Sequence, residues 1–240
     1  MASTRSDTEP NSHSIKWHYQ DTGVARAYDG DRFTAFPGRV LNRLERRVIE
    51  DAIRTLSTGR QKPLVLDAPC GTGRITEWLL GMGCEVIAAD IAAPMIEVAR
   101  ARCARFGDRV RFVQADLESL TLPDRSVDVV TCVRLFHHLA TEQRGRILKE
   151  LGRVSRDAVI VNVALSSPYY RLRRRLKQAL RQGISRCSST WAEIDREAGD
   201  AGLSVASWRF VARYLSEDLF VLMKRMPDTE SYEGPIADRR

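Results

Sequence analysis

A glycine turn between two acidic residues carries the clearest chemical signal in this sequence. The apolar segment Leu64–Asp67 is followed by Gly71 and Gly73, and a second apolar segment ends in Asp90. Glycine has no Cβ, so a ligand can approach the backbone closely. A carboxylate about 20 residues further along is placed to bind a ribose diol. The spacing predicts a site for a nucleotide-like ligand, while the glycine turn alone would equally fit a tight connection between a strand and a helix.

A third aspartate, Asp116, follows another β-prone segment, Val110–Gln114. The carboxyl ends of parallel strands meet at one edge of a sheet, where ligands of open α/β folds bind. We therefore expect Asp67, Asp90 and Asp116 to lie at the same edge. Asp67 would accept hydrogen bonds from the glycine loop or, through water, from a ligand amine.

The elements that must position these residues alternate between strand and helix, after an amphipathic helix over Gly38–Leu56 that should cover the sheet. The predicted segments are Leu64–Asp67, Gly73–Leu80, Glu85–Asp90, Pro94–Arg105, Val110–Gln114, Val127–Cys132, Thr141–Val154 and Ala158–Ala164. Such alternation indicates an α/β fold with a doubly wound, mostly parallel sheet. Two further β-prone runs, Leu203–Phe210 and Leu219–Lys224, predict a terminal hairpin.

These motifs resemble the class I S-adenosylmethionine-dependent methyltransferases, whose first motif reads Asp-x-Gly-x-Gly-x-Gly. Asp67, Gly71 and Gly73 match it, whereas Pro69 stands at the first glycine and removes one backbone N–H. The resemblance extends over roughly residues 60 to 165 through Asp90, the Gln-Ala-Asp-Leu stretch at 114–117 and the strand at 127–132. It implies a Rossmann-like, seven-stranded sheet with an antiparallel terminal strand, and S-adenosylmethionine as the methyl donor.

The resemblance also implies roles for individual residues. Gly71 and Gly73 would pass beneath the donor, Asp90 would bind the ribose hydroxyls, and Asp116 would accept from the adenine amine beside the N–H of Leu117. An arginine ahead of the first strand, for which we favour Arg39, would bind the donor carboxylate. The complete donor-binding set is Arg39, Asp67, Gly71, Gly73, Asp90, Ile91, Met95, Asp116, Leu117 and Val133.

Two adjacent histidines supply the candidate catalytic groups. His137 and His138 lie in a Phe-His-His-Leu stretch that resembles the corresponding segment of ubiquinone- and menaquinone-type methyltransferases. An imidazole can take a proton from a hydroxyl near neutral pH. We expect His137 to be the better candidate base and His138 the second, the alternative being that a histidine packs and supports the loop. Arg134 would bind an acidic group of the substrate.

Cysteine usage and hydropathy predict an intracellular, cytoplasmic protein. The five cysteines form no Cys-x-x-Cys pair and have no histidine at metal-binding spacing, so we expect free thiols and no metal. The sequence has no run of about 18 apolar residues and no apolar segment of a secretory signal near its start.

The domain organisation follows from composition. Residues 1–16 and 227–240 are predicted disordered tails, and 17–226 a single methyltransferase domain with an N-terminal cap over 17–57. A helical insertion or lid over about 166–190 contains the basic, amphipathic stretch Arg171–Arg186. This stretch is either a solvated helix, a contact for an anionic membrane surface on the inner face, or a contact for a phosphorylated or carboxylated substrate. Nucleic acid is less favoured, because few aromatic residues accompany the charges.

The function expected from the resemblance is methyl transfer to a small-molecule or lipid-linked acceptor. The Asn/Asp-Pro-Pro-Tyr signature of amine methylation is absent, which favours an oxygen or carbon acceptor, and oxygen is our leading interpretation. An RNA methyltransferase and a non-catalytic module that binds the donor are the alternatives. A nicotinamide-dependent dehydrogenase is disfavoured, because the glycine turn departs from Gly-x-Gly-x-x-Gly.

Overall fold

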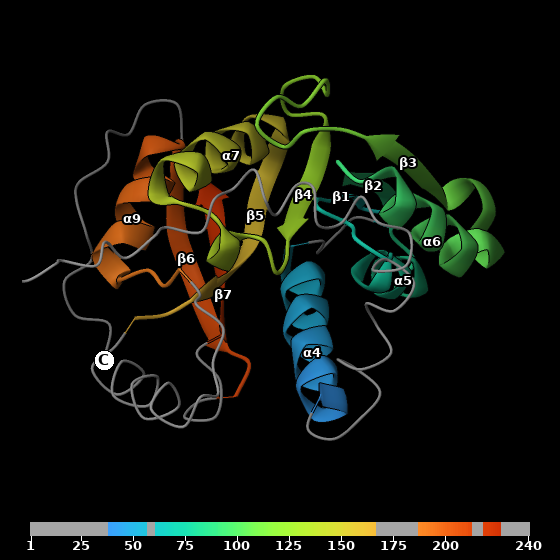
Figure 1. Ribbon diagram of the computed structural model, residues 1–240, viewed down its shortest axis with the longest axis horizontal. Coiled ribbons are helices and arrows are strands. Elements are labelled where there is room, and N and C mark those ends of the chain that lie inside the picture. Colours follow the sequence, from blue (N-terminus) through green and yellow to red (C-terminus); the bar gives the residue numbers. More distant parts are fainter. Residues whose placement is uncertain (1–37, 57–60, 167–186, 213–217, 227–240) are drawn as a thin grey trace, which may run out of the picture.

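A single seven-stranded sheet organises the protein (Figure 1). The computed structural model describes residues 38–56, 61–166, 187–212 and 218–226. In sheet order the strands run β3-β2-β1-β4-β5-β7-β6. Their bounds are β1 Leu64–Asp67, β2 Glu85–Asp90, β3 Val110–Gln114, β4 Val127–Cys132, β5 Ser155–Ala164, β6 Leu203–Phe210 and β7 Asp218–Arg225.

The central strands are apolar on both faces because helices cover both faces. β1 pairs in parallel with β2 and with β4, placing Leu66 between Ile87 and Val130. These three side chains pack in one core, whereas their neighbours Val65 and Val129 pack in another core on the opposite face. This alternation is the period of two expected of a strand. It explains why the buried strands read as continuous apolar runs.

The last two strands form the predicted hairpin. β7 runs antiparallel between β5 and β6, opposite in direction to both. This arrangement confirms the predicted Rossmann-like methyltransferase fold with its antiparallel terminal strand. A register shift between Val205 and Ser207 marks an irregularity in β6.

Helices cover the two faces as two groups. Helices α4 (Gly38–Leu56), α5 (Arg74–Gly81) and α6 (Ala93–Cys103) contribute to the core on one face. Helices α7 (Thr141–Val154) and α9 (Trp191–Asp200) contribute to the core on the other. Short 3-10 turns, η1 (Ala104–Arg109) and η2 (Phe136–His138), follow α6 and β4. None of the helices within the described ranges is long and apolar enough to cross a membrane.

The main differences from the sequence predictions concern α6, β5 and α9, while α5 and β7 differ by one residue at each end. Helix α6 ends at Cys103 and continues as η1, rather than running to Arg105, and β5 begins at Ser155. Helix α9 was not predicted from hydrophobic periodicity. Its signal is a capping box, in which Thr190 accepts from the backbone N–H of Glu193 while the Glu193 side chain accepts from the N–H of Thr190. The predicted tails and the basic stretch at 171–186 lie outside the described residues.

Candidate functional site

A cavity opens where the carboxyl ends of β1, β2 and β4 meet the segments that follow them. The empty space between its walls, including the part that is open solvent, is about 1100 Å³. Its walls come from the glycine loop after β1, the end of β2, the segment after β3, and the segment after β4 together with α7. Because ligands of open α/β sheets bind at this edge, the cavity is the candidate binding site.

The glycine loop forms one wall. Gly71 has a φ of 52°, and a Cβ built on it would meet nothing within 4 Å, so its open side is free for a ligand. Its N–H donates to the Asp90 carboxylate at 2.8 Å, and the N–H of Cys70 donates to the carbonyl of Ala89 at 2.8 Å. The Ala68–Pro69 peptide is cis. The loop after β1 is thus fastened to the end of β2.

Gly73, the second glycine of the motif, contacts protein rather than the cavity. With a φ of 79°, it would place a Cβ only 2.9 Å from Cα and Cβ of Ala99 on α6. It is absent from the cavity wall. Gly73 therefore allows the start of α5 to pack closely against α6, and supports the site from behind.

Asp90 joins the glycine loop to the segment that follows β2 through hydrogen bonds. Its Oδ2 accepts from the N–H of Gly71, and its Oδ1 accepts from the N–H of Ala92 at 2.9 Å. Burial raises the pKa of this carboxyl, and the backbone donors oppose the shift. A carboxylate has about four lone-pair directions, so acceptor capacity remains for ligand hydroxyls.

The segment after the neighbouring strand β3 carries the second acid of the cavity wall. Asp116 follows β3, and its Oδ1 accepts from the N–H of Glu118 at 3.1 Å. The predicted donor-binding residues Ile91, Met95, Leu117 and Val133 also line the cavity. Apolar side chains between two acids are suited to a flat heterocycle that has polar groups at its edges.

Asp67 takes a different position from the other two acids. It is fully buried and accepts hydrogen bonds from Oγ1 of Thr76 at 2.6 Å and Oγ1 of Thr131 at 3.1 Å. Desolvation raises its pKa to about 7. Asp67 does not line the cavity. It ties α5 to the end of β4 beneath the glycine loop.

Arginines other than the predicted one reach the cavity. Arg39 is exposed on α4 and is not part of the wall, which instead includes Arg74 and Arg134. Both guanidinium groups form ion pairs with Glu45 of α4, which is only 1% exposed. Arg134 had been singled out in the sequence, but Arg74 and Glu45 had not. The only sequence signal for this cluster was an acidic residue, Glu45, within the amphipathic helix. The sequence alone did not show that this residue is buried or which arginines pair with it.

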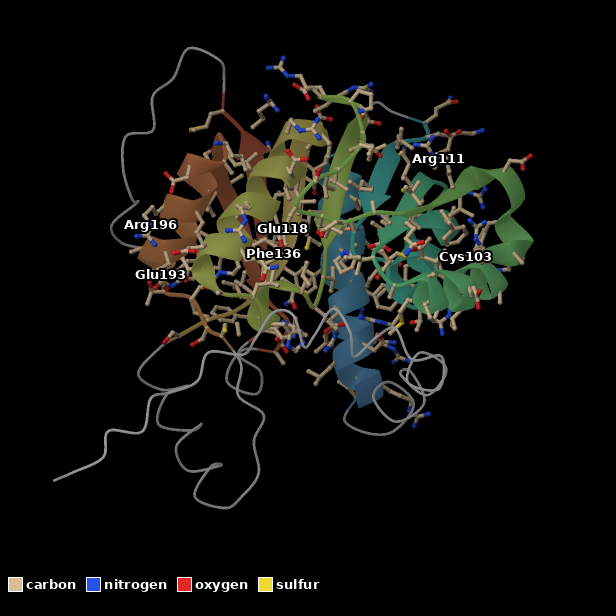
Figure 2. All side chains as sticks on the ribbon, turned by 45° about the horizontal axis from the view of Figure 1, so that its top comes forward. Cys103, Arg111, Glu118, Phe136, Glu193 and Arg196 are labelled. Carbon is tan, nitrogen blue, oxygen red and sulfur yellow. The ribbon has the colours of Figure 1, made fainter. Side chains whose placement is uncertain are left out.

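The two adjacent histidines of η2 occupy different positions relative to the cavity. His138 lines the cavity next to Leu139, whereas His137 is 4% exposed and is not part of the cavity wall. The carbonyl of His137 accepts from the N–H of Cys187 at 2.9 Å. Phe136, 2% exposed, anchors this turn in the core beside β4 and α7 (Figure 2). Of the two predicted bases, His138 has the position from which an imidazole can reach a ligand.

The buried cysteines are held as thiols. Burial raises the pKa of Cys70, which lines the cavity, and of Cys132 at the end of β4. A raised pKa disfavours the reactive thiolate. Among the described residues, no group of three metal-binding side chains comes together.

Comparison with known proteins shows that part of this sequence is similar to methyltransferases. Residues 65–158 match the family model described as "Methyltransferase domain". The malonyl-[acyl-carrier protein] O-methyltransferase of Salmonella typhimurium is 36% identical over 114 residues, covering 46% of this chain and 42% of that protein. The demethylmenaquinone methyltransferase of Thermus thermophilus is 38% identical over 92 residues, covering 38% and 41%. The chain thus spans less than half the length of these two curated relatives.

Solved structures show the same fold. Magnesium protoporphyrin IX methyltransferase from Synechocystis PCC 6803, crystallised with bound SAH, superposes with a TM-score of 0.75 at 20% identity, covering 90% of this chain and 100% of that one. The 1,6-didemethyltoxoflavin-N1-methyltransferase of Burkholderia thailandensis has a TM-score of 0.65 at 20% identity, covering 94% of each chain.

Proposed function

We propose that this chain, which carries a class I S-adenosylmethionine-dependent methyltransferase domain, transfers the donor's methyl group to an oxygen atom of a small-molecule or lipid-linked acceptor. The single observation that carries the proposal is the cavity at the carboxyl edge of the sheet. There Gly71 leaves its open side to a ligand, and Asp90 and Asp116 face the same space from two neighbouring strands.

The residues present fit the donor. Asp90 would accept from the ribose hydroxyls with the acceptor capacity that Gly71 and Ala92 leave. Asp116 would accept from the adenine amine. Ile91 and Leu117 would cover the adenine ring and exclude water. Asp67 and Gly73 would act indirectly, because they hold the glycine loop and α5 from behind.

The donor supplies an activated methyl group, so the chain's main task is positioning. Holding reactants in line can lower a barrier by about 7–11 kcal/mol, whereas a general base contributes about a hundred- to ten-thousandfold in rate. For a hydroxyl acceptor, His138 would take the proton, since it lies in the cavity wall. A carboxylate acceptor would require no base, because it is already ionised near neutral pH.

The names of the relatives support small or carrier-linked acceptors rather than nucleic acid. Their acceptors, as named, are a malonyl-carrier protein and demethylmenaquinone. We place the activity in the cytoplasm, with contact to the inner membrane face when the acceptor is lipid-linked. This contact would involve the basic stretch at 171–186, outside the described residues.

The proposal is tested by donor binding and by product labelling. Calorimetric titration with S-adenosylhomocysteine should give one site per chain, and methyl-labelled donor should transfer label to a fraction of a cell extract. Treating the extract with ribonuclease should leave the labelled product intact. Absence of nucleoside binding would refute the proposal, and label lost after ribonuclease treatment would identify an RNA methyltransferase instead.

A further inference from the structure

Three exposed arginines form a row along helix α4. Arg39, Arg43 and Arg47 follow one another at intervals of four residues, which places them on one side of the helix. All three are exposed, and within the described part of the chain none of their side chains forms a hydrogen bond or an ion pair. This arginine row is therefore a line of positive charge that the described residues do not neutralise.

The arginine row is unfavourable for its own helix. Like charges four residues apart on a helix repel each other. The first turn of α4 contains Arg39 and no acidic residue, although the positive end of the helix dipole favours acids there. Departures from local rules are expected where residues serve a function. A negatively charged partner would remove both of these costs.

A single apolar side chain accompanies the arginine row. Among the described residues, Val40 is the one large apolar side chain that is exposed, at 49%. It lies three residues before Arg43 and seven before Arg47, so it faces the same side of α4 as both. Arg46 also lies near this side, but it is paired with Glu50 at 2.6 Å and is not needed for the argument.

Helix α4 places this surface beside the candidate binding site. Its amino-terminal part projects past the carboxyl ends of the strands, at the edge of the sheet that carries the cavity (Figure 1). The inner side of the same segment contacts the cavity wall, since Asn42 accepts from Arg74, and Glu45 pairs with Arg74 and Arg134. A partner bound to the outer side of α4 would therefore lie next to the cavity.

The composition of this surface fits a membrane better than a protein or a nucleic acid. Stable protein interfaces have an apolar centre from which charges are depleted, and Val40 alone cannot provide one. Single-stranded nucleic acids are bound by positive charge together with aromatic side chains, and α4 contains no aromatic residue. An anionic bilayer attracts basic residues through charge, and its headgroup region accepts an apolar side chain.

We infer that the arginine row and Val40 form a contact surface for the anionic headgroups of a membrane. The inference goes beyond the proposed function, which assigned membrane contact to the stretch at 171–186 alone, and it does not depend on the identity of the acceptor. Each basic residue near an anionic surface contributes about fivefold in affinity, so the arginine row corresponds to about a hundredfold.

Vesicle sedimentation of the full chain tests the inference. Wild type at low ionic strength should sediment with vesicles of phosphatidylcholine and phosphatidylglycerol in equal parts, but not with phosphatidylcholine alone, and added salt should release it. The triple variant Arg39→Gln/Arg43→Gln/Arg47→Gln should bind the mixed vesicles about a hundredfold more weakly. Wild type that binds neither kind of vesicle would overturn the inference. A triple variant that binds like wild type would also overturn it, and would leave vesicle binding to other residues.

A second triple variant controls for net charge. Arg100→Gln/Arg105→Gln/Arg111→Gln also removes three exposed arginines, of which Arg100 lies over the Phe112 ring and Arg105 pairs with Glu77. This control should bind the mixed vesicles within about threefold of wild type, because its arginines lie on other elements. An equal loss in both triple variants would show that only the total charge matters, and would contradict a contact surface on α4.

A conservative variant tests whether charge is what the arginine row supplies. Lysine at all three positions keeps the charge and should retain vesicle binding, since headgroup attraction does not require the planar guanidinium. Loss of binding with lysine would indicate a directional contact and overturn the inference. So would binding to RNA that the glutamine variant loses, if the two proteins do not differ on vesicles.

Donor binding is measured on the same proteins. The arginine row does not line the cavity, so the glutamine variant should keep the wild-type melting temperature and its affinity for S-adenosylhomocysteine. A matched melting temperature shows that a loss of vesicle binding does not come from unfolding. Absence of S-adenosylhomocysteine binding in wild type would refute the proposed function, whereas the vesicle results decide this inference on their own.

Discussion

Charged residues are arranged differently at the two edges of the sheet. At the carboxyl edge, Asp67 and Asp90 are buried, and desolvation raises the pKa of both carboxyl groups. At the amino edge, the pKa of Glu150 is lowered, chiefly by hydrogen bonds from Arg153. One edge therefore holds carboxylates at an energetic cost, and the other edge is stabilised by its carboxylates.

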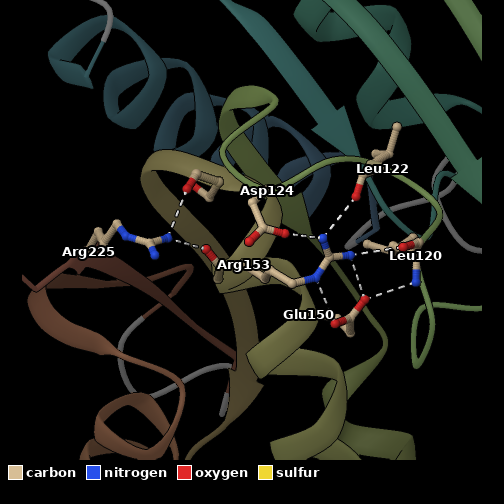
Figure 3. Close-up of polar contacts among 8 residues, drawn as sticks. Leu120, Leu122, Asp124, Glu150, Arg153 and Arg225 are labelled. Carbon is tan, nitrogen blue, oxygen red and sulfur yellow. Dashed lines mark hydrogen bonds and ion pairs between the residues drawn. The ribbon is translucent and has the colours of Figure 1, made fainter. Parts of the chain in front are cut away.

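Arginine shows the same contrast. At the amino edge, Arg153 donates to the carbonyls of Leu120 and Leu122 and to the carboxylates of Glu150 and Asp124 (Figure 3). Nearby, Arg225 donates to the carbonyls of Gly152 and Ser155. At the carboxyl edge, by contrast, two arginines share the single carboxylate of Glu45. Arg153 and Arg225 thus fasten loops at the amino edge, whereas Arg74 and Arg134 join the cavity wall to α4 through Glu45.

The largest expected effect is the pH dependence that Asp67 imposes on stability. Its folded pKa of about 7 lies above the usual value of 3.8, so the unfolded state ionises first. The contribution of Asp67 is fully present below pH about 4 and is lost as the pH rises to about 7. Wild type should lose up to about 4 kcal/mol of unfolding free energy relative to Asp67→Asn across this range, at 1.36 kcal/mol per pKa unit.

Glu150 should show the opposite sign. Its folded pKa is lowered, so its contribution to stability is present above the usual value of 4.5 and is lost as the pH falls. Urea unfolding of wild type, Asp67→Asn and Glu150→Gln between pH 3 and 8 measures both differences. If the two variants diverge from wild type in the same direction with pH, the contrast between the edges is wrong.

The Glu45→Gln variant should lower the unfolding free energy by about 3 kcal/mol, because the largely buried guanidinium groups of Arg74 and Arg134 lose the carboxylate that they share. The matched control lies on the same helix. Glu50→Gln removes an exposed i,i+4 pair with Arg46 and should cost at most about 0.5 kcal/mol. Chemical denaturation at pH 7 measures the unfolding free energy of both variants. Equal losses of unfolding free energy would show that the ion pairs of Glu45 contribute no more than an exposed surface pair.

Substituting the two glycines of the motif should distinguish a role in ligand binding from a role in stabilising the fold. Gly73→Ala forces a Cβ against Ala99 at a positive φ and should cost about 2–3 kcal/mol of stability. Gly71→Ala meets no protein atom within 4 Å and should cost about 1 kcal/mol, from its positive φ. Its methyl group would instead obstruct the ligand, so nucleoside affinity should fall more in Gly71→Ala. Thermal melting and calorimetry of both variants check this, and the reverse ranking of affinities would contradict it.

The smallest effect on binding is expected at the amino edge. Arg153→Gln should lower stability by about 1–2 kcal/mol, because it weakens hydrogen bonds that fasten the segment before β4. Affinity for S-adenosylhomocysteine should stay within about twofold of wild type, since the fastened segment lies at the opposite edge from the cavity. A clear loss of affinity would show that the two edges are coupled.

The fold was largely predictable because local and long-range signals agree. Buried parallel strands such as β1, β2 and β4 read as largely apolar runs of the right length, and their observed bounds match the predicted ones. Helix α9 escaped prediction because its signal lies in the Thr190 and Glu193 cap rather than in a long apolar periodicity. Helix propensity and hydrophobic periodicity do not reveal a capping box, because it depends on the pair of residues and not on either residue alone.

The site was predictable where a residue's role follows from its place on a strand. Asp90 and Asp116 line the cavity as expected, because strand ends set their positions. Asp67 and His137 are buried behind the wall. The local turn decides which of the residues at a strand end points into the cavity, and the sequence pattern does not show this. The pairing of Glu45 with Arg74 and Arg134 joins residues 29 and 89 positions apart and depends on how α4 docks. No single-sequence pattern contains that docking.

The most direct test of the central claim is a crystal structure with S-adenosylhomocysteine bound. The account predicts the ribose hydroxyls on the carboxylate of Asp90, the adenine beside Asp116 and Leu117, and the backbone of Gly71 beneath the ligand. An empty cavity, or a ligand whose sugar contacts neither aspartate, would contradict it.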